Sequence, residues 1–207
     1  VVGAVGLPAI ASGRPANQIP VEHAPGEADA LSTPQGDAWS EVEGVSVPLS
    51  SAPSGLPNAA DIETDSVTVK AARTDSTLFV RLEWADPTKN DSVTDSTEFA
   101  DAVAVQLPAE TGTHPGIALG SQDTKVNVWY WSATGDAQEI IAGGPGTITE
   151  TDGTISTASE YSDDSWTVVF ARDLTVDGEN RAQIELEHDV DTAYAVWNGA
   201  NGERSGH

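Results

Sequence analysis

The chain has 207 residues and contains no cysteine, no methionine and only nine basic residues. Without cysteine, the chain cannot form disulfides, bind iron–sulfur clusters or hold a metal through thiolates. Because even position 1 is not methionine, we expect a sequence that is processed or trimmed at its start. So few Lys and Arg exclude a general nucleic-acid-binding surface, which needs clustered basic side chains to contact phosphates.

Acidic residues dominate what is present. There are 33 Asp and Glu, which gives a formal charge of -24, and the basic residues include only three lysines, Lys70, Lys89 and Lys125. Repulsion of this size works against a compact state, but at molar salt the Debye length falls to about 3 Å and mutes it. Hydrophobic residues still make up 38% and six tryptophans occur, unlike a disordered acidic tail. The composition predicts a globular domain that works in strong salt.

Two regions follow from the composition along the chain. Residues 1–36 are rich in Pro, Ala and Gly and predict an N-terminal arm, whereas residues 37–207 read as one domain. Residues 1–12 are apolar and uncharged but too short to span a membrane. We interpret them as the remnant of a signal sequence or of an anchor, and therefore expect an exported protein. An ordinary extended arm is the alternative.

Short alternating runs predict an all-β domain. Leu78, Val80, Leu82 and Trp84 share one face of such a run, and Val67 and Val69 alternate with polar residues in the same way. The other strands are predicted at residues 101–107, 125–132, 137–141, 147–150, 165–172, 181–187 and 192–197. Without any sustained helical periodicity, these strands favour an antiparallel β-sandwich. Its long polar loops, residues 86–97 and 112–123, are the expected places for function.

Motifs for hydrolytic catalysis or tight metal binding are not evident. The four histidines lack the spacing of a zinc site, and no GxSxG nucleophile elbow occurs. We therefore expect no catalytic residues and no turnover by this chain alone. Asp86, Asp91 and Asp95 recur in one loop and have the oxygen ligands that Ca²⁺ prefers. Such clustering is expected by chance in so acidic a chain, so the sequence does not favour a calcium site.

Trp129 and Trp131 form the most informative pattern, because they share one face of a predicted strand beside a long Gly-containing loop. Aromatic pairs of this kind commonly fill a core. They can also line a site for a flat apolar ligand or a sugar.

Three ordered motifs resemble the haem b-binding gamma subunits of ethylbenzene dehydrogenase, dimethylsulfide dehydrogenase, and selenate and chlorate reductases. The first is Leu119-Gly120 followed by Lys125-Val-Asn-Val-Trp-Tyr-Trp131. The second is Phe99-Ala-Asp-Ala-Val-Ala-Val-Gln-Leu-Pro108, and the third is Ala193-Tyr-Ala-Val-Trp-Asn-Gly-Ala-Asn-Gly-Glu-Arg-Ser-Gly206. The resemblance covers the chain from about Trp39 to its end.

This resemblance implies a β-sandwich that holds one haem b and relays single electrons. The implied partners are an Fe–S subunit and a molybdenum-cofactor catalytic subunit, with a membrane cytochrome b or quinol-oxidising subunit as a further candidate. It also implies a place on the outer face of the cell membrane, and a respiratory nitrate reductase complex is one such setting in a salt-loving organism. The implied haem-binding residues are Leu119, Gly120, Asn127, Trp129, Trp131, Trp197 and Arg204.

The chain departs from the family at the haem iron. The family's Met ligand corresponds to Leu119, which has no lone pair, and its Lys ligand would follow His207, the last residue here. His114, in the same loop as Leu119, and His207 are the candidate replacement ligands, since a neutral imidazole binds haem iron well.

Two other functions remain open from the sequence. The chain can be a haem-free descendant that serves as a structural subunit of the same complex. It can also be a carbohydrate-binding module, because β-sandwiches with tryptophan faces often bind sugars.

Overall fold

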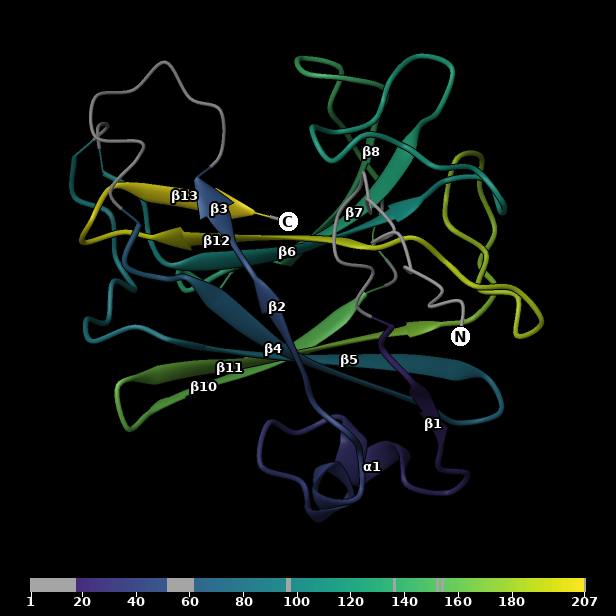
Figure 1. The fold of residues 1–207 in the computed structure, drawn as a ribbon, viewed down its shortest axis with the longest axis horizontal. Helices are drawn as coiled ribbons and strands as arrows, with labels where there is room; N and C mark the ends of the chain where they lie inside the picture. The colour runs from purple at the N-terminus through teal and green to yellow at the C-terminus, as the bar shows by residue number, and fades with distance from the viewer. Residues whose placement is uncertain are drawn as a thin grey trace, which may run out of the picture.

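The computed structural model describes residues 18–51, 62–95, 98–135, 137–151, 153 and 155–206, and the side chains up to residue 202. Two β-sheets pack face to face, as Figure 1 shows. Apart from one short parallel pair, β1 with β4, the paired strands are antiparallel. The predicted antiparallel β-sandwich is confirmed.

The first sheet, sheet A, has the strand order β1-β4-β5-β11-β10, with β2 on the same edge of β4 as β1. Its strands are β1 (Val21–His23), β2 (Val45–Pro48), β4 (Ser66–Arg73), β5 (Thr77–Ala85), β10 (Ser156–Ser162) and β11 (Ser165–Asp173).

The second sheet, sheet B, has the order β3-β13-β12-β6-β7-β8-β9. Its strands are β3 (Ser50–Ser51), β6 (Ala102–Pro108), β7 (Val126–Ser132), β8 (Ala137–Ala142), β9 (Thr149–Glu150), β12 (Ala193–Asn198) and β13 (Glu203–Gly206).

The main core lies between the sheets and follows from the period of two along each strand. Leu82 and Trp84 of β5 point inward, as do Val103 of β6 and Trp129 of β7, and all are buried. Burial of such side chains contributes roughly 1.5–3 kcal/mol each. The interdigitating inner faces therefore account for most of the stability of the sandwich.

A second, smaller core covers the outer face of sheet A. Helix α1 (Ala28–Leu31) and the short 3-10 helix η1 (Asp37–Ser40) lie against that face (Figure 1), and they bury Leu31 and Trp39 beside Phe79. Arg81 Nε donates to the Pro34 carbonyl oxygen at 2.9 Å. Residues 18–36, the second half of the predicted arm, thus pack on the domain. Residues 1–17 lie outside the described residues.

Most strand predictions agree with the structure, but the strand at residues 181–187 is wrong. That segment is irregular, because its polar groups are used individually: Ile184 N donates to Leu174 O at 2.8 Å, and the Arg181 side chain reaches Glu139. Strand β10 was missed, since its polar sequence STASEYS carries little hydrophobic signal. It forms by pairing its backbone with β11 along seven residues.

Candidate functional site

Strand β7 carries the motif residues Trp129 and Trp131, and both point into the space between the sheets. Trp129 is fully buried and Trp131 is 3% exposed. Trp131 packs edge-on against Trp84 and Trp166, with ring centroids 6.5 and 5.0 Å away. These two tryptophans fill the core, so any ligand in contact with β7 lies on the opposite, outer face of sheet B.

Asn127 also points inward and belongs to a buried polar cluster with Glu139, Arg172 and Arg181. Arg172 Nη1 donates to Asn127 Oδ1 at 2.9 Å and to Glu139 Oε1 at 3.2 Å, and its guanidinium carbon lies 4.9 Å from the Trp129 ring centroid. Arg181 Nη2 donates to Glu139 Oε2 at 2.5 Å. Burial lowers the pKa of Arg172, which the Glu139 carboxylate partly offsets. The cluster ties the two sheets together behind β7.

The outer face of sheet B is the unusual surface of this molecule. The registers of β12, β6, β7 and β8 place on it Ala102, Ala104, Gln106, Pro108, Val126, Val128, Tyr130, Ser132, Gln138, Ile140, Ala142, Ala193, Ala195 and Trp197. None of these residues is charged, although the chain as a whole carries a charge of -24. By contrast, the outer face of sheet A carries Lys70, Arg81 and Glu83 at paired positions.

Small side chains and one aromatic pair shape this outer face. Ala104 lies opposite Tyr130 on one side and Ala195 on the other. The Tyr130 and Trp197 rings meet edge-on, with centroids 5.6 Å apart. The alanines and the aromatic pair make this face flat and apolar, but its centre is covered, because Ala102 and Ala104 are only 1% and 5% exposed.

The loop from 109 to 125 folds over the same face. Gln106 Nε2 donates to the Gly116 carbonyl oxygen at 3.1 Å, and Leu119 packs against Ala104, Val126, Val128 and Ala142. Leu119 O accepts from Gly144 N at 2.8 Å, which joins this loop to the turn between β8 and β9.

Leu119 and Gly120 both have a left-handed backbone, with φ of 62° and 65°. A Cβ on Gly120 would lie 2.3 Å from the Thr124 carbonyl oxygen, so only glycine fits there. A leucine with positive φ is strained, and strain of this kind gathers at binding sites. The Leu119-Gly120 motif is thus a tight backbone turn that holds the Leu119 side chain on the outer face.

The haem-binding residues predicted from the sequence fall into two groups. Leu119, Gly120 and Trp197 lie at the outer face of sheet B, where β13 also places Arg204 as the register partner of Trp197. Asn127, Trp129 and Trp131 lie behind that face, inside the core. The site assignment itself stays a prediction.

Of the two candidate iron ligands, only His114 belongs to the described residues. The His114 side chain is 80% exposed and its Nδ1 lies 2.6 Å from Asp191 Oδ2. His207 lies outside the described residues.

Sequence reasoning missed Ala104, Val128, Tyr130 and Ala195, which line the outer face. A signal was present in β7, because Val128 and Tyr130 alternate with Trp129 and Trp131 and must point to the other side of the strand.

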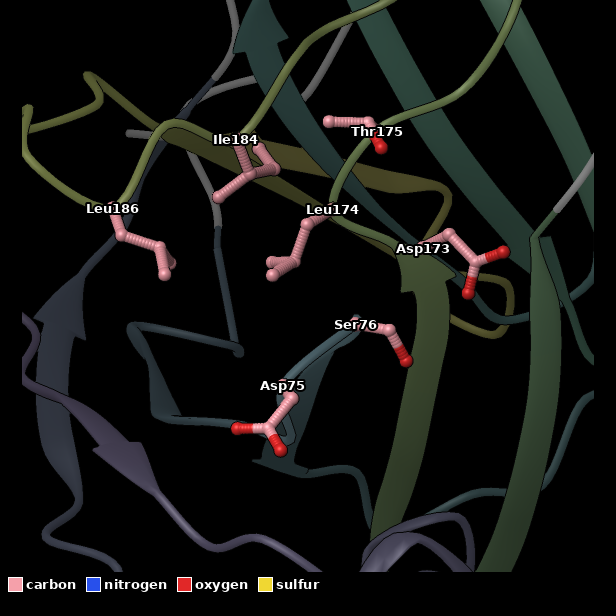
Figure 2. A pocket seen from close by; sticks show the side chains of 7 residues that line it. All are labelled: Asp75, Ser76, Asp173, Leu174, Thr175, Ile184 and Leu186. Atoms are coloured by element: carbon pink, nitrogen blue, oxygen red, sulfur yellow. The ribbon is translucent and has the colours of Figure 1, made fainter.

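A shallow pocket of about 390 Å³ lies at one end of sheet A, beside the β4–β5 turn, and Figure 2 shows its lining. It is lined by Asp75, Ser76, Asp173, Leu174, Thr175, Ile184 and Leu186. Two carboxylates and no basic side chain make it a poor place for an anionic ligand. It does not include any residue of the outer face of sheet B.

No helix in the part of the chain that the structure describes is long and apolar enough to cross a membrane. The same residues contain no group of three or more His, Asp or Glu side chains arranged to hold a metal ion.

The chain is similar to several proteins of known designation. It is 48% identical over 200 residues to the chain designated respiratory nitrate reductase heme subunit ORF7 of Haloferax mediterranei, covering 96% of this chain and 72% of that one. It is 33% identical over 180 residues to the chlorate reductase gamma subunit of Ideonella dechloratans, covering 86% of this chain and 75% of that one. It is 36% identical over 148 residues to the dimethylsulfide dehydrogenase gamma subunit of Rhodovulum sulfidophilum, covering 67% of this chain and 54% of that one.

Solved structures share the fold at low identity. A family 9 carbohydrate-binding module from Caldicellulosiruptor kristjanssonii in complex with glucose superimposes with a TM-score of 0.50 and 16% identity, covering 82% of this chain and 75% of the module. A protein from Bacteroides uniformis, assigned to carbohydrate binding, gives a TM-score of 0.55 and 9% identity (90% and 87%). These likenesses concern the fold alone.

A family model described as ethylbenzene dehydrogenase matches residues 36–154 and 142–207. Together with the relatives at 33–48% identity, this match decides the family. The chain belongs to the ethylbenzene dehydrogenase family, among its gamma subunits.

Proposed function

We propose that this chain is the haem b subunit of a molybdenum oxidoreductase complex, and that it relays single electrons to or from an Fe–S subunit. The observation that carries the proposal is the outer face of sheet B, where β12, β6, β7 and β8 place no charged residue, where Ala104 and Ala195 lie side by side and over which the Leu119 loop folds. A porphyrin is flat and largely apolar, so it suits such a face. When bound, the haem supplies an iron that alternates between the ferric and ferrous states.

The residues present fit the porphyrin plane better than they fit the iron. Ala195 and Tyr130, which are partly exposed, would contact the ring. Leu119 packs on the cluster that includes Ala104, so the loop would have to shift for the ring to reach Ala104. Leu119 offers no donor atom, so His114 and His207 remain the candidate iron ligands on this chain. Arg204, opposite Trp197 in the register, is the candidate partner for a haem carboxylate.

The partners follow from the family. They are the Fe–S subunit and the molybdenum-cofactor catalytic subunit, and a membrane cytochrome b or quinol-oxidising subunit is a further candidate. We propose that the complex lies outside the cytoplasm, on the outer face of the membrane of an organism that lives in high salt. The closely similar chain from Haloferax mediterranei supports a respiratory nitrate reductase as the setting.

We assign no catalytic role to this chain. The relatives are designated heme or gamma subunits of oxidoreductases, which supports a non-catalytic role, and chemistry in the complex would belong to the molybdenum subunit. Substrate turnover by the purified chain without its partners would contradict this assignment.

The absorption spectrum of the complex purified in high salt tests the proposal. We expect a Soret band with resolved α and β bands on reduction. Ala195→Leu, on the half-exposed part of the outer face, should lower the haem content severalfold, whereas Ala158→Leu on β10 of the other sheet should leave it unchanged. A colourless complex that still contains this chain would instead favour the haem-free structural subunit.

Carbohydrate binding has less support from the structure. The tryptophans that suggested it, Trp129 and Trp131, are buried between the sheets and cannot stack on a sugar. Retention of the chain on a polysaccharide column, without copurifying subunits, would revive that function.

A further inference from the structure

Two acidic side chains are buried at the end of the sandwich where β5 leaves sheet A and β6 enters sheet B. Asp86 directly follows β5 and Asp101 directly precedes β6, and both residues are 0% exposed. Two neighbouring residues bridge them, because Asn198 Nδ2 donates to Asp86 Oδ1 at 3.4 Å and Gly199 N donates to Asp101 Oδ1 at 2.9 Å, so the two carboxyl groups lie close together. Two buried carboxylates in contact repel each other strongly unless something positive lies between them.

The surrounding groups satisfy only some of the oxygens. Asp101 accepts hydrogen bonds from Asn90 N at 2.7 Å, Trp166 Nε1 at 2.9 Å and Gly199 N at 2.9 Å. Asp86 Oδ1 accepts from the amide and hydroxyl of Thr88 at 3.1 and 3.0 Å. Asp86 Oδ2 and Asn90 Oδ1 are buried without any hydrogen-bond partner.

No basic side chain compensates the pair. In the part of the chain that the structure describes, no Lys, Arg or His bonds to either carboxylate. The nearest candidate along the chain, Lys89, pairs with Asp91 at 2.8 Å instead. Burial raises the pKa of Asp86 to about 6, which reflects the cost of keeping this carboxylate charged without a cation.

These observations fit a hard cation better than a shared proton. A proton shared between the carboxylates would leave Asn90 Oδ1 unsatisfied, whereas a cation would bind that oxygen together with the free Asp86 Oδ2. Oxygen-only ligands from two carboxylates and an amide, completed by water, are the set that Ca²⁺ takes.

We infer that Asp86, Asp101 and Asn90 form a Ca²⁺ site that joins the end of sheet A to the start of sheet B. Bound there, the cation would hold Asn90 against the ends of β5 and β6. The site differs from a cluster of Asp86, Asp91 and Asp95, because Asp91 is half-exposed and paired with Lys89. Its three ligands do not belong to the outer face of sheet B, although Asp101 directly precedes Ala102 of that face, and the test of the site does not require bound haem.

The test is calcium binding to the chelator-treated chain at fixed, multimolar KCl. We expect one saturable Ca²⁺ per chain by calorimetry and a melting temperature that rises by several degrees. Tb³⁺ should replace Ca²⁺ and give luminescence on tryptophan excitation, because Trp166 donates directly to Asp101. Asp86→Asn should lose the high-affinity site, whereas the matched variant Asp91→Asn, in the same connection, should keep it.

A second variant keeps the test decisive if Asp86→Asn folds poorly. Asn90→Ala keeps both carboxylates and should weaken Ca²⁺ binding about tenfold while leaving the stoichiometry at one. No saturable binding by the wild-type chain at millimolar Ca²⁺ would overturn the inference. Equal binding by the wild type and Asp86→Asn would overturn it too, since the ion would then bind to exposed acidic side chains.

Discussion

At the scale of the residue, the Leu119-Gly120 turn combines a strained backbone at Leu119 with a steric requirement for glycine at position 120. Glycine at position 120 is required by the approach of Thr124 O, but nothing in the backbone requires leucine at 119, where φ is also positive. The strained residue is held by its packing on the outer face of sheet B and by the bond from Gly144 N. Its side chain is therefore placed by the fold, at some cost in backbone energy.

Comparison of Leu119→Gly with Leu119→Ala isolates this strain. Both variants lose the leucine contacts, but only alanine keeps a Cβ in the left-handed conformation. We expect the Gly variant to be more stable than the Ala variant by about 1 kcal/mol, measured by urea unfolding in constant high salt. Equal unfolding free energies of the Gly and Ala variants would mean that the left-handed backbone at position 119 is not strained.

Gly120→Ala tests the steric requirement. The added Cβ meets a carbonyl oxygen at 2.3 Å, so the loop must move and we expect a loss of about 3 kcal/mol or more. Gly112→Ala is the control, because Gly112 has a similar φ of 77° and open space around it. The control should lose only about 1 kcal/mol. Similar losses of unfolding free energy in both variants would show that the cost comes from the positive φ alone and not from the contact with Thr124 O.

At the scale of the element, the strands are held in place by a buried ionic cluster as well as by apolar packing. Glu139 of β8, Arg172 of β11 and Arg181 of the following irregular segment connect sheet B to sheet A. Buried charges are costly to desolvate, so the cluster is stable only while every member has its partner. Its position directly behind Trp129 supports the strand that forms the candidate haem face.

Glu139→Gln should expose this dependence. Removing the carboxylate charge takes away the partner that Arg172 and Arg181 share, and we expect a loss of about 3–5 kcal/mol in unfolding free energy. Glu150→Gln on β9 is the control, because Glu150 is exposed and should change stability by less than 1 kcal/mol. A loss from Glu139→Gln as small as that of the control would contradict the role of the cluster.

At the scale of the whole molecule, charge is distributed unevenly. The central strands of sheet B, β12, β6, β7 and β8, place no charged residue on its outer face, while the formal charge of the chain is -24. An acidic surface opposes the compact state unless salt screens it. We therefore expect the molecule to need salt for folding.

Melting curves of the isolated chain from dilute buffer to multimolar KCl test the salt requirement. We expect unfolding in dilute buffer and a melting temperature that rises steeply with salt. Ca²⁺ added at constant ionic strength separates the proposed site from general screening. A melting temperature that is independent of KCl would contradict the screening argument.

The sequence by itself determined the all-β class, most strands and the family, because alternation and motif order are properties of neighbouring residues. It also determined that Trp129 and Trp131 share a face. Only the tertiary structure decided that this face is the interior, and that Asp86 meets Asp101 and Glu139 meets Arg172. Local patterns say which residues point the same way, whereas pairing across the sheets depends on how the whole chain folds back on itself.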